Sequence, residues 1–267
     1  MEKHKITGRS VTNPKGRIFV IGDLHGCYEE VVELLKICKV TSKDKVIFTG
    51  DLVDRGLHND KCVDLAMKIE SEQNAPACIL GNHEERHLYY WNLDVSGKDP
   101  NVTIPTHIET RKQLRPEHYE YFNRLPYYIR LPEYNSVVVH AGVFPGINIE
   151  QQDPHIMLHV QMINPSEATT TKWPSKAPSG WKFWTHHWTG PEHIIFGHSV
   201  LTKPLVTEHV TSVDGGAVFG LELWALELPS RKIHRIKANK NYGGGSRGRT
   251  ESRVKIYNVH GDVGTYS

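Results

Sequence analysis

Long apolar runs are missing from this 267-residue sequence. No stretch approaches the roughly 18 apolar residues that a helix needs to cross a bilayer. The opening residues, MEKHKITGRS, also lack the apolar region of a secretory signal. We therefore expect a protein that does not span a membrane and that works in the cytoplasm.

Cysteine is scarce as well. The chain has four, all in its first third and none in C-x-x-C spacing: Cys27, Cys38, Cys62 and Cys78. This pattern favours free thiols in a reducing cytoplasm.

Charge of one sign is not in excess. The chain has 32 basic and 30 acidic residues, a formal net charge of +2, so the overall field gives no reason to expect a polyanionic partner. The apolar fraction of 38% and charged fraction of 23% are those of a folded globular protein. Any preference for anions must therefore be local. Histidine, by contrast, is abundant, with 17 residues.

Alternation of strands and helices is the main pattern of the first half. Five apolar or β-branched runs have strand length and end at glycine or histidine: residues 18–21, 46–49, 77–80, 137–139 and 194–196. Helical spacing occurs over residues 28–38 and again after an expected cap at Asn59 or Asp60. The pattern predicts a layered α/β fold, in which polar residues past the strand ends meet at one edge.

The second half is less regular. We expect an excursion from the core over residues 92–109, a helix over 116–125, and strands over 221–228 and 232–236. Residues 243–249 (GGGSRGR) are typical of a flexible linker, and residues 253–259 alternate like an edge strand. The predicted division is a catalytic domain over residues 1–238 and a Gly/Arg-containing tail over 239–267.

Residues 151–191 contain four tryptophans: Trp173, Trp181, Trp184 and Trp188. So long an irregular stretch indicates an insertion or lid, whose tryptophans could stack on nucleobases. The alternative is an aromatic mini-core that covers the sheet. Histidines outside the motifs below, such as those at 155, 159, 186 and 187, are expected to be structural or exposed.

Five polar signatures follow the predicted strands: GDLHG at 22–26, GDLVDRG at 50–56, GNHE at 81–84, HAG at 140–142 and GHS at 197–199. Asp23 and His25 are two residues apart, so in extended backbone their side chains face the same way. The candidate metal ligands are Asp23, His25, Asp51, Asn82, His140 and His198. This mixture of oxygen and imidazole nitrogen favours manganese, iron or zinc over calcium, and Asp51 is the natural bridge between two ions.

In this order the motifs resemble the phosphoprotein-phosphatase branch of the calcineurin-like metallophosphoesterases, over about residues 18–228. The resemblance implies a sandwich of two β-sheets flanked by helices and two divalent metal ions, Mn²⁺ first and iron or zinc as alternatives. It assigns the first ion to Asp23, His25 and Asp51. It assigns the second ion to Asp51, Asn82, His140 and His198.

The resemblance also implies roles for three further residues. Arg55 would clamp phosphate, His83 would protonate the leaving oxygen, and Asp54 would orient the His83 imidazole. An arginine offers phosphate a planar, permanently charged fork. Asp54 is expected to fix the tautomer of His83 and to favour its cationic form.

Some features depart from the protein phosphatases. Residues 151–193 contain no arginine that could bind phosphate a second time, and Lys172, Lys176 or Lys182 are possible substitutes. Residues 213–220 resemble bacterial and phage members, including symmetrical diadenosine tetraphosphate hydrolases. Glu84, directly after His83, is instead like the protein phosphatases.

The leading functional prediction is hydrolysis of phosphomonoesters, including phosphoserine or phosphothreonine in proteins. The close alternative is cleavage of dinucleoside polyphosphates or nucleotide caps, and a third is a non-catalytic binding module. The partner would thus be a phosphorylated protein or a nucleotide. Nucleic acid is less favoured and would be bound through the tail arginines Arg247, Arg249 and Arg253.

Overall fold

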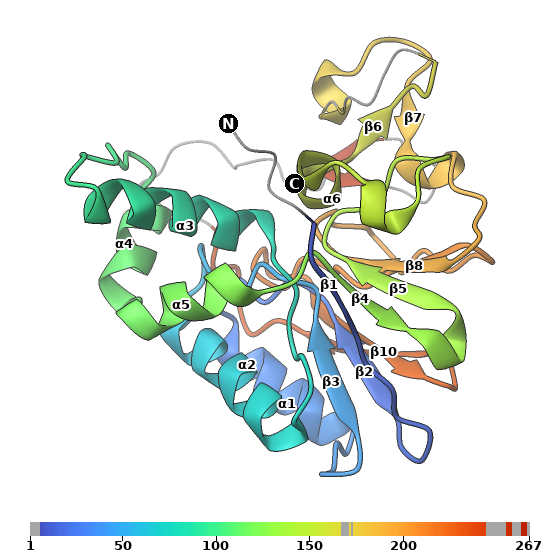
Figure 1. The fold of residues 1–267 in the computed structure, drawn as a ribbon, viewed down its shortest axis with the longest axis horizontal. Coiled ribbons are helices and arrows are strands. Elements are labelled where there is room, and N and C mark those ends of the chain that lie inside the picture. Colours follow the sequence, from blue (N-terminus) through green and yellow to red (C-terminus); the bar gives the residue numbers. More distant parts are fainter. Residues whose placement is uncertain (1–5, 167–170, 172, 244–254, 258–262, 266–267) are drawn as a thin grey trace.

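Two β-sheets lie face to face at the centre of the molecule (Figure 1). The computed structural model describes residues 6–166, 171, 173–243, 255–257 and 263–265. One sheet has the strand order β1 (Gly8–Ser10), β4 (Tyr128–Leu131), β5 (Ser136–Val139), β8 (His193–Phe196) and β9 (Val210–Ser212). The other has the order β11 (Lys232–Lys237), β10 (Glu222–Leu228), β2 (Ile18–Ile21) and β3 (Lys45–Phe48). The predicted α/β sandwich is confirmed.

Parallel pairing places the chemistry at one end of each sheet. β2 pairs in parallel with β3, with Phe19 opposite Val46, and β5, β8 and β9 are also parallel to one another. The expected strand at 77–80 is reduced to a parallel bridge between Phe48 and Cys78. The four-stranded sheet therefore leads into the first three motifs, and the five-stranded sheet leads into the motifs at His140 and His198.

Alternation along the strands builds two cores. Ile18 and Val20 on β2 pack between the sheets, whereas Phe19 and Ile21 on the same strand face the other way, toward the helices. All four side chains are fully buried. A strand with both faces covered reads as a continuous apolar run, which is why this segment was recognisable in the sequence.

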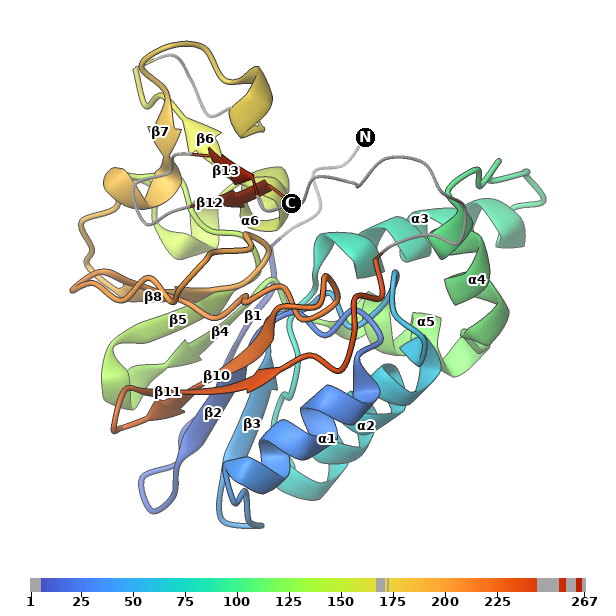
Figure 2. The same cartoon turned by 180° about the vertical axis from the view of Figure 1, so that it is seen from behind.

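Helices α1 (Tyr28–Ile37) and α2 (Asn59–Gln73) cover the outer face of the four-stranded sheet (Figure 2). The predicted caps of α2 are wrong by one residue. His58 occupies the cap position without a side-chain hydrogen bond, and Asn59 is the first helical residue. Its amide instead lies within hydrogen-bond distance of Gln113.

The expected excursion over residues 92–109 is helical at both ends and irregular between them. α3 (Asn82–Val95) starts at the third motif, residues 96–104 have no helix or strand, and α4 (Pro105–Gln113) begins with proline at its first position, where no backbone N–H is needed. α5 (Pro116–Arg124) confirms the predicted helix. Figure 1 shows these three helices grouped on one side of the sandwich.

The described residues between 151 and 191 form a small layer beside the five-stranded sheet. They contain α6 (Pro154–His159) and the antiparallel pair β6 (Met162–Ile163) and β7 (Lys182–Phe183). Trp184 is fully buried, with its ring 5.0 Å from that of Phe196, and a Cβ at Gly142 would collide with its indole. Glycine is thus required where this layer meets the motif after β5. Whether the layer is an insertion stays a prediction.

Short 3-10 turns complete the fold: η1 (Pro132–Tyr134), η2 (Ile149–Gln151), η3 (Pro174–Lys176) and η4 (Trp184–His186). β12 (Lys255–Tyr257) lies within the edge strand predicted over residues 253–259. It pairs antiparallel with β13 (Val263–Thr265). Arg247, Arg249 and Arg253 lie outside the described residues. In the described part of the chain, no helix combines the length and apolarity that crossing a membrane requires.

Candidate metal centre and active site

The five motif loops meet around a cavity of about 290 Å³. Seven of the nine predicted site residues line it: Asp23, His25, Asp51, Arg55, Asn82, His83 and His198. The other two, Asp54 and His140, are fully buried. The structure therefore brings all nine together, as expected for residues that follow neighbouring strand ends.

Backbone hydrogen bonds hold the first two loops against each other. The N–H groups of Leu24 and His25 both donate to the carbonyl oxygen of Asp51, at 3.1 and 2.8 Å. Glu84 fixes the same loop from below, because its carboxylate accepts from the N–H groups of Asp51 and Leu52, each at 2.8 Å. Glu84 was not among the predicted site residues, although it directly follows His83 in the third motif.

Several site residues have left-handed backbone. The φ angles are +45° at His25, +49° at Asp51, +75° at Asp54, +72° at Arg55 and +61° at His198. Residues other than glycine rarely adopt this conformation, and strain of this kind persists where the surrounding structure enforces it. Its concentration here indicates that the loops are held in one geometry.

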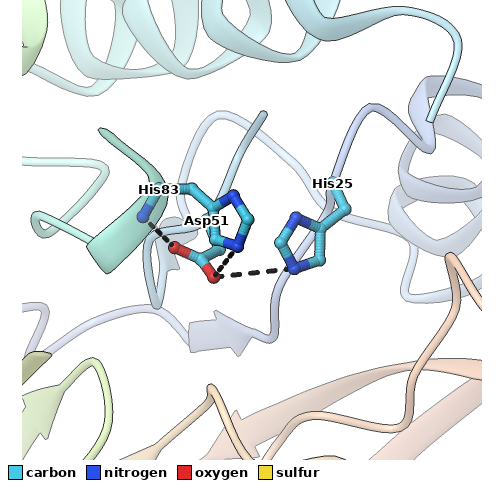
Figure 3. A group of neighbouring side chains, drawn as sticks. All are labelled: His25, Asp51 and His83. Carbon is cyan, nitrogen blue, oxygen red and sulfur yellow. Dashed lines mark hydrogen bonds and ion pairs between the residues drawn. The ribbon is translucent and has the colours of Figure 1, made fainter. Parts of the chain in front are cut away.

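Asp51 lies at the centre of the cluster (Figure 3). Its Oδ2 is 3.5 Å from Nε2 of His25, and its Oδ1 is 3.5 Å from Nε2 of His140. Its Oδ1 also accepts a hydrogen bond from the backbone N–H of His83 at 3.0 Å. The Asp51 carboxylate thus has a potential metal-ligand nitrogen on each of two sides, as a bridging ligand must.

Hydrogen bonds hold two histidines as neutral rings that could bind a metal ion through Nε2. Nδ1–H of His25 donates to the carbonyl of Val53, and Nδ1–H of His140 donates to that of Thr49, both at 2.7 Å. These bonds leave each Nε2 unprotonated and directed at the cluster, an arrangement typical of metal-binding histidines. Burial also lowers the pKa of both rings, that of His140 to about 3.

The amide oxygen of Asn82 belongs to a second group of potential metal-ligand atoms. It is 2.8 Å from Nε2 of His140 and 3.0 Å from Nδ1 of His198. Within the described residues, Nε2 of His198 is buried without a hydrogen-bond partner. Asp51, His140 and His198 could hold one ion, and His25 lies with Asp51 and His83 in an adjoining group.

Several buried acidic side chains lie close together in the site. Burial raises the pKa of Asp23, and the nearby Asp214 and Asp51 raise it further. Burial likewise raises the pKa of Asp51 well above its usual range and that of Asp214 to about 6. Without a cation these carboxyls repel one another, so the donor set fits divalent metal ions. Asp214 was missed as a site residue, although the segment 213–220 had been singled out.

Three histidines surround Asp54. Its carboxylate is 2.5 Å from Nδ1 of His83, 2.8 Å from Nε2 of His87 and 3.4 Å from Nε2 of His107. Burial alone would raise the pKa of Asp54, but the hydrogen bonds from His83 and His87 outweigh it and hold the pKa well below its usual range. His87 was detectable in sequence, since it lies one helical turn after His83. His107 comes from α4 and had no such signal.

Asp54 favours the cationic form of His83, as expected, but other groups oppose it. Burial and the adjacent guanidinium of Arg55 lower the pKa of His83 to about 4, despite the opposing effect of Asp54. Nη2 of Arg55 donates to Nε2 of His83 at 3.0 Å, and Nη1 contacts His25. The guanidinium carbon lies 5.4 Å from the ring centre of Phe219, which supports it from the side.

The second phosphate-binding cation was not found among the described residues. Of those that line the cavity, Arg55 is the one lysine or arginine. Lys176 and Lys182 are exposed and do not line it, and Lys172 lies outside the described residues.

The four tryptophans of residues 151–191 differ in solvent exposure. The predicted stacking surface is wrong for three of them, because Trp181, Trp184 and Trp188 are only 8%, 0% and 4% exposed. Trp173 is 55% exposed and lines the cavity.

The family model of the calcineurin-like phosphoesterases matches residues 16–222. The chain belongs to this family. Calcineurin-like phosphoesterases use a dinuclear metal centre, and the protein is a metal-dependent phosphoesterase. A purely binding role is therefore set aside. The ligand assignments and the roles of His83, Asp54 and Arg55 stay predictions that this geometry supports.

Relatives within the family point toward nucleotides. The bis(5'-nucleosyl)-tetraphosphatase PrpE [asymmetrical] of Oceanobacillus iheyensis is 27% identical over 242 residues, covering 85% of this chain and 94% of the relative. That of Bacillus mycoides is 28% identical over 231 residues, covering 79% and 89%. The resemblance to tetraphosphatases is thus confirmed, but these relatives are of the asymmetrical kind, whereas the sequence analysis named the symmetrical kind.

Solved structures agree on the fold. One that is provisionally assigned as a diadenosine tetraphosphatase aligns with a TM-score of 0.73 and 24% identity, covering 87% of this chain and 98% of its own. A serine/threonine phosphatase from Saccharomyces cerevisiae aligns with a TM-score of 0.56 and 16% identity, covering 89% and 86%. At these identities the likeness concerns the fold alone.

Proposed function

We propose that this protein hydrolyses the phosphoanhydride bonds of dinucleoside polyphosphates. The observation that carries the proposal is its similarity, over 79–85% of this chain and 89–94% of theirs, to relatives named asymmetrical bis(5'-nucleosyl)-tetraphosphatases. The likeness to protein phosphatases has 16% identity and extends only to the fold. The nucleotide alternative of the sequence analysis is therefore preferred over phosphoserine or phosphothreonine hydrolysis.

The proposed metal ligands are those that the family resemblance implies, and the two groups of side chains that share Asp51 support them. Asp23, His25 and Asp51 would hold one divalent ion, and Asp51 would share the second with Asn82, His140 and His198. When bound, such a pair lowers the pKa of water and neutralises charge on a reacting phosphate. The mixed oxygen and nitrogen donors favour Mn²⁺, with iron or zinc as alternatives.

The protein's own side chains supply binding and proton transfer. The guanidinium of Arg55 lines the cavity and would bind phosphate oxygens, which would draw it away from His83 and His25. Without that cation beside it, Nε2 of His83 would take up a proton from solvent and then give it to the leaving oxygen, while Asp54 holds Nδ1–H. A phosphoanhydride leaving group needs less protonation than a serine alkoxide, so this site suits anhydrides.

A product analysis tests the proposal. The full chain is incubated with Mn²⁺ and either diadenosine tetraphosphate or a phosphoserine peptide, and the products are separated by anion exchange. We expect AMP and ATP from diadenosine tetraphosphate, at a kcat/KM at least about tenfold above that for the peptide. Two molecules of ADP would indicate symmetrical cleavage. Release of phosphate from the peptide alone would overturn the proposal.

We also propose a cytoplasmic location. The support is chemical: all four cysteines are buried free thiols, as in proteins of reducing compartments. The possible contact of the tail with nucleic acid has no support from the described residues.

A further inference from the structure

Trp173 differs from the other tryptophans of its segment in being exposed at the catalytic cavity. Its side chain is 55% exposed and lines the cavity together with His198. The two ring centres are 6.2 Å apart, and the ring planes are inclined by 39°. A large apolar face is thus held open to water beside the predicted ligands of the second ion, where folding alone gives no reason to place it.

Phe219 is the other aromatic ring of the cavity, but it has a different environment. The guanidinium of Arg55 lies 5.4 Å from its ring centre. Phe219 therefore supports the phosphate-binding arginine. Trp173 stands next to His198 instead, so it is the ring available to a substrate group that extends from the phosphates.

Gln161 adds a polar group to this part of the cavity. It is only 3% exposed, yet it lines the cavity, and its Oε1 is buried without a hydrogen-bond partner in the described part of the chain. Its backbone is fixed on both sides, by Thr171 Oγ1 and by the N–H of Trp184. A buried amide oxygen without a partner is costly unless a ligand supplies one.

We infer that Trp173 and Gln161 form a nucleobase-binding subsite of the catalytic cavity. The base stacks on the indole of Trp173, and the Gln161 amide pairs with its polar edge, as glutamine does with the N6 and N7 positions of adenine. A volume of about 290 Å³ is at the small end of ligand pockets, so the cavity holds one nucleotide of the substrate, and the rest extends into solvent. The inference deepens the proposed function and rests on it for the identity of the substrate.

Competition between two inhibitors tests the subsite without requiring turnover of a nucleotide. ATP and inorganic tripolyphosphate both carry three linked phosphates, but only ATP has a base. Their inhibition constants are measured against p-nitrophenyl phosphate hydrolysis by the full chain with Mn²⁺. We expect ATP to bind more tightly than tripolyphosphate, and Trp173→Ala to reduce this preference about 5- to 150-fold, the range for loss of one stacked base.

Two further variants give the test its specificity. Trp173→Phe keeps an aromatic face and should restore most of the preference for ATP. Gln161→Leu keeps the side-chain size and should reduce the preference about fivefold or more. Tyr89→Ala removes a similarly exposed aromatic ring that lies on α3 outside the cavity, and it should leave the preference unchanged.

The outcomes separate this inference from the proposed function. If Trp173→Ala changes both inhibition constants equally, or neither, the subsite is refuted even when diadenosine tetraphosphate is cleaved. If the preference for ATP depends on Trp173 but diadenosine tetraphosphate is inert, the subsite stands and the proposed substrate does not.

Discussion

The motif loops at the strand ends and the layer formed by residues 151–191 contribute to the same cavity under different constraints. In the motif loops, Asp51 is fixed by its backbone and by its side chain, with bonds to Leu24, His25, His83 and Glu84. In the layer, Trp184 is buried but Trp173 is held open. We therefore expect the loops to determine which reaction is catalysed and the exposed edge of the layer to determine which substrate is bound.

Replacing the central carboxylate should break the first side of this comparison most completely. Asp51→Asn keeps the shape but removes the charge that two dications share, so both sites should lose metal together and kcat should fall by several orders of magnitude. Metal content by atomic emission and turnover with p-nitrophenyl phosphate provide the readouts. A variant with two tightly bound ions and near-normal turnover would refute the bridge.

Removing the proposed acid should have a smaller effect that depends on the leaving group. His83→Asn should slow hydrolysis of alkyl phosphates by about 10²- to 10⁴-fold, the usual contribution of general acid catalysis, while metal content stays constant. The loss should be smaller for diadenosine tetraphosphate and p-nitrophenyl phosphate, whose leaving groups are more acidic. Equal losses on all three substrates would indicate electrostatic positioning.

The buried part of the layer should matter for stability. Trp184→Ala removes a fully buried indole that packs on Gly142 and Phe196, so the free energy of unfolding should fall by about 3–5 kcal/mol. Trp173→Ala should change it by less than about 0.5 kcal/mol. Urea denaturation of both variants measures the contrast. Similar losses would contradict the division between a buried anchor and an open edge.

The smallest expected effect lies at the opposite ends of the strands. Asp44, just before β3, accepts hydrogen bonds from Arg17 and Thr41, which outweigh burial and lower its pKa to about 2. Its stabilisation is therefore present above the ordinary pKa of 3.8 and is lost as pH falls through about 2. Asp44→Asn should cost about 1–2 kcal/mol near neutral pH and flatten this acid dependence.

Chemical denaturation between pH 2 and 7 measures the free energy of unfolding of the wild type and of the Asp44→Asn variant. The turnover number of the Asp44→Asn variant at pH 7 should match that of the wild type, since the residue is remote from the cavity. A change in kcat would show that the two ends of the sheet are coupled.

Local pattern was enough to predict the parts of this fold that depend on neighbours in sequence. Ile18 to Ile21 is apolar at every position because both faces of β2 are covered, and each motif was found because it directly follows such a run. For residues 92–109 the glycine, proline and aspartate indicated an excursion, and residues 96–104 are indeed irregular. The pattern missed the helical ends, since α3 extends to Val95 and Pro105 starts α4.

Tertiary contacts decided what the sequence could not. Nothing in the local sequence distinguishes Trp173 from Trp184. Trp184 is buried because its indole packs against Gly142, which is distant in sequence. The pKa of His83 depends on tertiary contacts for a similar reason: Asp54 raises it, as predicted, but burial and Arg55 lower it more strongly. His107 reaches Asp54 only because α4 folds back on α3.

Asp51 follows a strand of one sheet, and His140 follows a strand of the other. An ion held by both is therefore a cross-link between the two halves of the sandwich, made without a covalent bond. Because the unfolded chain cannot offer this arrangement, binding at a free ion concentration 1,000 times the Kd adds about 4 kcal/mol to the free energy of unfolding. The supply of metal would then set the stability of the folded chain as well as its rate of turnover.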